Sequence, residues 1–130
     1  MCLRGLADLA DAYLRDHTSA AVQTYVVFVP ALGAEEEDVG PAMQFLDNRN
    51  VHYYWDPDGT VMGRYARTLA VDVKLWDFWT IYRPGSLWKP GRPPVPDFWR
   101  HQLSSLPRKS RLDVDEFVAR IESMKSREQL

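Results

Sequence analysis

The feature that most constrains the fold is a run of five consecutive apolar residues, Tyr25 to Val29, in the first quarter of the chain. These residues are β-branched or aromatic, which are the types enriched in strands. Successive side chains point to opposite faces of a strand, so a run without polar alternation predicts that both faces are covered. We therefore expect a central parallel strand over residues 22–29, as in an α/β sheet.

Helical patterns flank this strand on both sides. Apolar residues recur at three- and four-residue spacing, or follow an acidic first turn, in four segments. The predicted helices cover residues 3–16, 36–49, 61–69 and about 113–127. The last one begins with a capping box, Asp113 with Glu116, and a hydrophobic staple, Leu112 with Phe117. Thr60 is expected to cap the third helix.

Further strands are predicted between and after these helices. Val51 to Trp55 is a short β-rich run that ends at Asp56-Pro57-Asp58-Gly59, a turn sequence. Residues 75–82 form an aromatic strand, and Leu87–Trp88 is expected to return beside it as a short antiparallel arm. The proline-rich segment 89–96 cannot enter a sheet interior and is predicted to be a surface loop or a linker.

This order of elements predicts an α/β fold in which helices cover both faces of a mixed sheet. The chain has 130 residues, of which 45% are hydrophobic and 26% charged, so we expect one domain over residues 1–130 with a buried core. Its formal charge of −2 gives no electrostatic basis for binding nucleic acid or an anionic membrane. We also expect no transmembrane segment.

In layout, nearly the whole chain resembles the thioredoxin-like superfamily, in its peroxiredoxin and periplasmic thiol-reductase branch. The residues that carry the resemblance are Cys2 at the head of the first helix, the strand Tyr25–Val29, the turn Trp55–Gly59, the helix Val61–Leu69, and the strand and turn Trp76–Gly85. Uncharacterised bacterial members share an Asp-Phe-Trp-x-His-Gln-Leu segment, here Asp97–Leu103. The resemblance implies a three-layer sandwich and thiol:disulfide exchange with a protein or a small thiol or disulfide.

The chain also departs from the pattern of that family. Family members begin with a strand that leads into Cys-x-x-Cys, but here Met1 directly precedes Cys2, the only cysteine. The resemblance therefore assigns Cys2 to the second, resolving position of an N-terminally truncated domain. Val73–Trp76 also lacks the cis-proline of the family. Either the coding start lies upstream, or this is a shortened member without dithiol chemistry. The expected compartment is cytoplasmic as written, and periplasmic if a signal-bearing N-terminus is missing.

Two kinds of site residue follow, each with a structural alternative. A helix N-terminus favours the thiolate, which would make Cys2 reactive, whereas residue 2 of a chain can also be simply an exposed thiol. Trp76 and Trp79 are candidates for contact with a substrate or partner, but alternating aromatic residues are also what core packing requires.

No metal or cofactor is predicted. The three histidines are far apart in sequence and have no second ligand at helical spacing; they are His17, His52 and His101. Asp56 and Asp58 lack the remaining ligands of a calcium loop and are interpreted as turn residues. The basic cluster Arg108, Lys109 and Arg111 is interpreted as a solvated connection.

Two alternatives to thiol chemistry remain. The first is a catalytically inactive thioredoxin-like interaction or scaffold domain, which we expect to form a homodimer through an exposed sheet edge, because unpaired strand edges are templates for pairing. The second is a small-molecule pocket near the aromatic strand.

Overall fold

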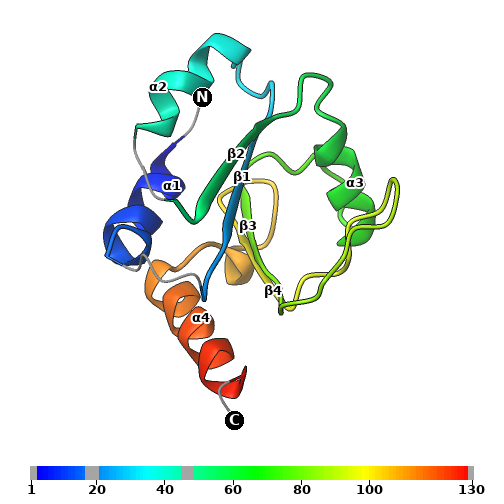
Figure 1. Ribbon diagram of the computed structural model, residues 1–130. Helices are drawn as coiled ribbons and strands as arrows, with labels where there is room; N and C mark the ends of the chain where they lie inside the picture. The colour runs from blue at the N-terminus through cyan, green and yellow to red at the C-terminus, as the bar shows by residue number, and fades with distance from the viewer. Residues whose placement is uncertain (1–2, 17–20, 45–48, 129–130) are drawn as a thin grey trace. The chain divides into compact units, whose positions relative to one another are not determined.

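A computed structural model describes residues 3–16, 21–44 and 49–128 of the chain. It shows a mixed α/β protein, as the order of sequence patterns predicts. Figure 1 labels its helices and strands. The chain divides into two compact units, Met1–Gly59 and Thr60–Leu130. That residues 1–130 form one domain stays a prediction.

The first unit opens with a helix in two parts. Helix α1 spans Arg4–Leu9 and continues as a π-helical turn, η1, over Ala10–Leu14. Its apolar stripe is buried, which confirms the periodicity predicted for residues 3–16. The buried members are Leu6, Leu9, Ala10, Tyr13 and Leu14.

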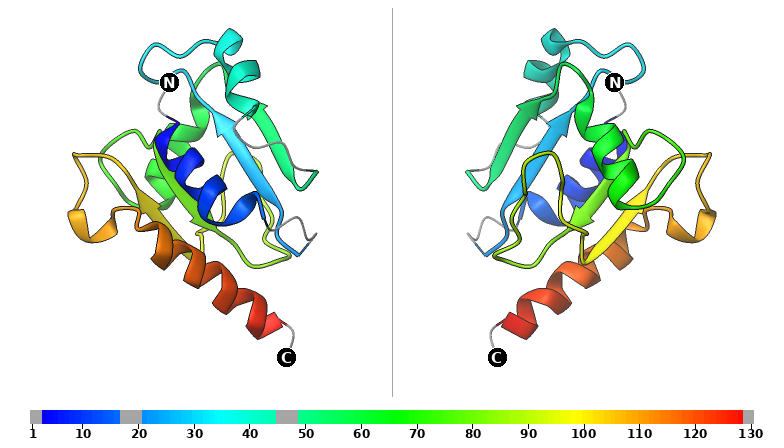
Figure 2. Two further views of the ribbon diagram at one scale, coloured as in Figure 1. Left: turned by 90° about the vertical axis from the view of Figure 1, so that its left-hand side faces the viewer. Right: turned by 90° about the vertical axis from the view of Figure 1, so that its right-hand side faces the viewer.

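Two parallel strands follow in this unit. Strand β1 spans Thr24–Phe28 and strand β2 spans Val51–Trp55, with Thr24 opposite Val51 and Phe28 opposite Trp55. Figure 2 shows the two strands side by side in both views. The parallel pairing and the position of β2 confirm the sequence-based prediction.

The prediction that both faces of β1 are covered is wrong. Burial alternates along the strand, and the side chains of Tyr25 and Val27 are 63% and 41% exposed. Among the described residues β1 pairs with β2 alone, so the run is not the centre of a wide sheet. An apolar sequence without alternation therefore does not guarantee two covered faces.

The connection between β1 and β2 contains less helix than predicted. A 3-10 turn, η2, spans Glu36–Asp38 and leads into helix α2, Val39–Met43. The predicted helix over residues 36–49 is therefore too long, and its positions 45–48 lie outside the described residues. Pro41 lies in the first turn of α2, where proline is tolerated.

The second unit begins with helix α3, Thr60–Thr68, one residue earlier than predicted. The turn before it forms as expected, with the Gly59 N–H donating to the Asp56 carbonyl at 3.2 Å and Gly59 at φ 63°. Thr60 is thus the first helical residue and not the cap that the sequence suggested.

An antiparallel pair supplies the strands of this unit. Strand β3 spans Phe78–Ile81 and strand β4 spans Phe98–His101, with Phe78 opposite His101. The predicted strand over residues 75–82 is therefore too long, and the predicted arm Leu87–Trp88 is wrong. The partner comes from beyond the proline-rich segment, because the ladder needs backbone N–H groups that proline lacks.

A small core joins these elements. Tyr65 of α3 packs with Leu75, which precedes β3, and with Leu103, which follows β4. Partly buried side chains surround them; these are Val61, Leu69, Val71, Val73, Trp76, Phe78, Tyr82, Trp99 and Leu106. All members of this cluster lie in the second unit, which therefore has a core of its own.

The unit ends with the 3-10 turn η3, Arg108–Ser110, and helix α4, Val114–Glu128. Asp113 caps α4, because its Oδ1 accepts the Glu116 N–H at 3.0 Å. This confirms the predicted start of the last helix. Among the described residues the strands form two separate two-stranded sheets, β1–β2 and β3–β4. A single mixed sheet in a three-layer thioredoxin-like sandwich stays a prediction.

Candidate functional site

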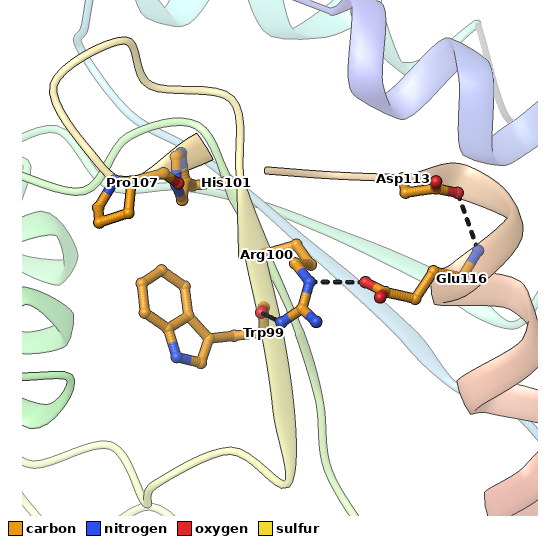
Figure 3. Close-up of polar contacts among 6 residues, drawn as sticks. All are labelled: Trp99, Arg100, His101, Pro107, Asp113 and Glu116. Atoms are coloured by element: carbon orange, nitrogen blue, oxygen red, sulfur yellow. Dashed lines mark hydrogen bonds and ion pairs between the residues drawn. The ribbon is translucent and has the colours of Figure 1, made fainter. Parts of the chain in front are cut away.

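His101 is fully buried at the end of β4, and both of its ring nitrogens bond backbone groups. Figure 3 shows the ring beside Pro107. Its Nδ1 accepts the Leu103 N–H at 3.0 Å, and its Nε2 lies 2.9 Å from the Pro107 carbonyl oxygen. A backbone N–H can only donate and a carbonyl can only accept, so the ring is the tautomer protonated at Nε2. His101 fastens the chain after β4 and is not placed to act as a general base.

The neighbouring Arg100 connects β4 to the start of α4. Its Nε donates to Glu116 Oε1 at 2.7 Å, and its Nη1 donates to the Trp99 carbonyl at 2.8 Å (Figure 3). The guanidinium also lies over the Phe98 ring, 4.1 Å from its centroid. The Arg100 and Glu116 side chains therefore stabilise the contact between β4 and α4.

Two tyrosines of the second unit share a hydrogen bond. Their hydroxyl oxygens, of Tyr65 and Tyr82, lie 2.8 Å apart, and the Tyr82 hydroxyl donates to the Pro94 carbonyl at 2.8 Å. Burial raises the pKa of Tyr65, against the lowering effect of its hydrogen bonds to Tyr82 and Thr80. Burial and then the bond to Tyr65 raise the pKa of Tyr82. Neither hydroxyl is therefore activated as a phenolate nucleophile.

The Tyr82 bond is one of the contacts that hold the connection between β3 and β4, which we call the Arg83–Asp97 loop. At its base the Arg83 N–H donates to Asp97 Oδ2 at 2.8 Å, and the Arg83 Nε lies 3.2 Å from Asp97 Oδ1. Along α3, the Thr68 hydroxyl donates to the Pro93 carbonyl at 3.3 Å. Figure 1 shows the loop lying beside α3, and these bonds fix it there.

The tip of this loop is a tight turn of its own. The N–H of Lys89 donates to the Arg92 carbonyl at 3.2 Å, and the N–H of Arg92 donates to the Lys89 carbonyl at 2.9 Å. Pro90 and Gly91 form the corner, with Gly91 at φ 76°. Proline followed by a residue of positive φ is the arrangement of a type II turn.

Large apolar side chains of the loop nevertheless face solvent. Leu87 is 80% and Val95 is 72% exposed. Trp88 is half exposed and meets Tyr65 edge-on, with ring centroids 5.5 Å apart. The loop thus exposes apolar side chains together with the cations Lys89 and Arg92. Hydrogen bonds hold its backbone at the base, at the tip and along α3. We therefore take it as the candidate interaction site.

The first unit has an exposed face as well. Tyr25 and Val27 of β1 lie opposite His52 and Tyr54 of β2 in the register of the pair. The Tyr25 and His52 rings are stacked with centroids 5.0 Å apart, and His52 Nε2 lies 2.9 Å from Gln23 Oε1. Tyr54 is 54% exposed. This face carries no acidic or basic side chain apart from the imidazole.

The structure places the residues singled out from the sequence in different settings. Cys2 and His17 lie outside the described residues. Trp76 is half-buried against the Tyr65–Leu75–Leu103 core, and Trp79 is half-buried in β3 opposite Arg100. Arg108 and Lys109 are exposed on η3. Within the described ranges, no three side chains of His, Cys, Asp or Glu gather in a way that could hold a metal ion.

Sequence reasoning missed the Arg83–Asp97 loop as a site. It described only the proline-rich part, and as a connection. The signal was present in the Pro90-Gly91 turn pair and in the absence of any acidic residue from Pro84 to Pro96. What the sequence did not show is that Leu87 stays outside the core.

Comparisons with the models of protein families, with curated proteins and with solved structures found no match to this chain. Of the helices in the described part of the chain, none combines the length and the apolar character that crossing a membrane requires.

Proposed function

We propose that this chain is a protein-interaction domain of thioredoxin-like chain order, which binds a partner through the Arg83–Asp97 loop. The order of its elements supports the first part: a parallel β1–α2–β2 unit, helix α3, the antiparallel pair β3–β4 and the final helix α4 follow one another as in the family it resembles. With one cysteine, the chain has no dithiol pair of its own.

One observation carries the proposal. The Arg83–Asp97 loop is hydrogen-bonded at its base, at its tip and along α3, yet Leu87 is left 80% exposed. An ordered loop has little conformational entropy left to lose on binding, which favours affinity. Exposed apolar groups beside cations on such a loop are typical of an interaction surface rather than of a folding requirement.

The test is site-specific photocrosslinking in the cells that make the protein. We replace Leu87 with a benzophenone amino acid and expect one adduct of defined mass after irradiation, whose partner peptide is read by mass spectrometry. The matched control carries the same group at Arg108, an exposed residue of η3 that is not part of the loop. Adducts that are absent at Leu87, or identical at both positions, would contradict the proposal.

Thiol:disulfide exchange is a second candidate, and it rests on the family resemblance and on the position of one residue. Helix α1 begins at Arg4 with Leu3 as its N-cap residue, and Cys2 precedes Leu3 in the sequence. The family resemblance implies that Cys2 would resolve a mixed disulfide that an upstream cysteine forms with the substrate. That step needs a cysteine that this chain does not contain.

The alkylation rate of the thiol against pH tests this candidate. An activated Cys2 reacts with iodoacetamide at a rate that levels off well below the ordinary thiol pKa of about 8.5. A rate that still rises through about pH 8.5, as for a free peptide thiol, would remove the thiol candidate and leave the interaction domain.

A further inference from the structure

We infer that the partner of the Arg83–Asp97 loop is a second copy of this chain, whose acidic segment Glu35–Asp38 binds Lys89 and Arg92. The inference rests on the proposed function and names the occupant of the same site. Its basis is charge complementarity between two exposed surfaces of the one sequence.

The cationic side is a pair of like charges held close together. Lys89 and Arg92 are bridge partners across the Pro90–Gly91 turn, so their side chains leave the same face of the ladder. Like charges directly opposite each other are unfavourable. Among the described residues neither side chain has an ion pair, and the acid at the base of the loop, Asp97, is engaged by Arg83. An anionic partner would relieve this repulsion.

The acidic side likewise has two exposed carboxylates, Glu36 and Glu37. Glu35 and Asp38 form a reciprocal capping box with each other's backbone N–H groups, the Glu35 N–H donating to Asp38 Oδ2 at 2.8 Å. Glu36 and Glu37 between them are exposed and have no ion pair within the described part of the chain. No lysine or arginine occurs from Pro30 to Gln44. Within the described residues, two carboxylates without an ion pair thus match two cations without one.

Each charged pair also has an exposed aliphatic neighbour. Leu87 precedes Lys89, and Leu32, 67% exposed, precedes the acidic segment. Leu32 is held at φ 53° in a turn that the Ala34 N–H closes on the Ala31 carbonyl at 3.0 Å. Exposed ion pairs contribute little on their own, so burial of these apolar side chains is needed beside them. The expected contact is therefore weak and sensitive to salt.

Sedimentation velocity of the full chain with charge-reversed variants tests the inference. The wild type should associate as concentration rises at about 0.02 M salt and dissociate at about 0.5 M, where screening is strong. Lys89→Glu/Arg92→Glu and Glu36→Lys/Glu37→Lys should each weaken self-association at least about tenfold, and their equimolar mixture should restore it. Circular dichroism checks that each variant is folded.

Two matched controls accompany these variants. Arg108→Glu/Lys109→Glu makes the same charge change on η3 and should associate like the wild type. Tyr25→Ser/Tyr54→Ser removes the exposed aromatic groups of the β1–β2 face and should also leave association unchanged.

Several outcomes would overturn the inference. Association that survives Lys89→Glu/Arg92→Glu, or that the mixture fails to restore, rules out this contact. If the β1–β2 variant alone dissociates the protein, that face is the interface. A wild type that stays monomeric but cosediments with phosphatidylglycerol vesicles through Lys89 and Arg92 makes the loop a lipid-binding site. If the protein is monomeric and Leu87 crosslinks to another protein, the proposed function stands. Only the inference that the partner is a second copy is then rejected.

Discussion

At the scale of single residues, buried polar groups in this protein are matched to specific partners. His101 bonds the Leu103 N–H and the Pro107 carbonyl, and Tyr82 bonds Tyr65 and the Pro94 carbonyl. No buried side-chain nitrogen or oxygen in the described residues lacks a hydrogen-bond partner. His101 and Tyr82 therefore hold loops in place.

His101→Phe should lower the free energy of unfolding by about 2–4 kcal/mol. The substitution leaves a buried N–H and a carbonyl without partners, and each costs about 1–3 kcal/mol. His52→Phe is the control, because His52 is less buried and phenylalanine can keep the stacking on Tyr25; we expect a loss below about 1 kcal/mol. Urea denaturation measures both, and equal losses would contradict the structural role of His101.

The tyrosine pair should make stability fall at alkaline pH. Unfolded tyrosines lose their protons near pH 10, whereas burial raises the pKa of Tyr65 and Tyr82 in the folded state. Above about pH 10 the folded state therefore binds more protons than the unfolded one, and the free energy of unfolding decreases as pH rises. Urea denaturation at about pH 8, 10 and 11 should show a smaller decrease for Tyr65→Phe/Tyr82→Phe. An unchanged decrease would contradict this assignment.

At the scale of elements, short turns decide where the longer segments begin and pair. The Asp56–Gly59 turn precedes α3, Asp113 caps α4, and the Pro90–Gly91 turn shapes the tip of the Arg83–Asp97 loop. Each of these three features depends on one or two residues: Gly59 and Gly91 adopt a positive φ, and the Asp113 side chain accepts a backbone N–H.

Gly91→Ala should destabilise the protein by about 1–2 kcal/mol, because L-residues are strained at the φ of 76° found there. Space is not the reason, since a Cβ at Gly91 would meet no atom within 4 Å. Gly40→Ala is the matched control: a Cβ at Gly40 is equally free of contacts, but the site is helical. There alanine should be neutral or stabilise by up to about 1 kcal/mol. Thermal unfolding should show a lower melting temperature for Gly91→Ala and an unchanged or higher one for Gly40→Ala. An equal decrease in both variants would contradict backbone strain as the cause.

At the scale of the whole molecule, the chain consists of two compact units, and the second has an apolar cluster drawn entirely from its own residues. Tyr65, Leu75 and Leu103 are brought together from one helix and from the two ends of the β3–β4 pair. The candidate loop is part of that unit and is fixed to its helix α3.

We therefore expect the fragment 60–130 to fold alone. Its near-ultraviolet circular dichroism should show ordered aromatic side chains, and heating should give a cooperative transition, because the Tyr65–Leu75–Leu103 core is complete within it. A fragment without ordered aromatic signals would mean that the core depends on residues 1–59. Leu75→Ala within the fragment is the control and should abolish the transition, since small domains tolerate little loss of core.

The sequence by itself determined the features that depend on neighbouring residues. Helical periodicity placed α1, α3 and α4, the Asp56–Gly59 sequence placed a turn, and Asp113 placed the start of the last helix. These signals are local, because capping, turn conformation and helix periodicity act over a few residues.

Only the tertiary structure decided which strands pair and which apolar side chains are buried. Phe98–His101, and not Leu87–Trp88, is the partner of β3, and one face of β1 stays exposed. The candidate loop followed from the same choice, since pairing β3 with β4 leaves the residues between them outside the ladder. Strand pairing and burial depend on residues that are distant in sequence, and no local pattern specifies them.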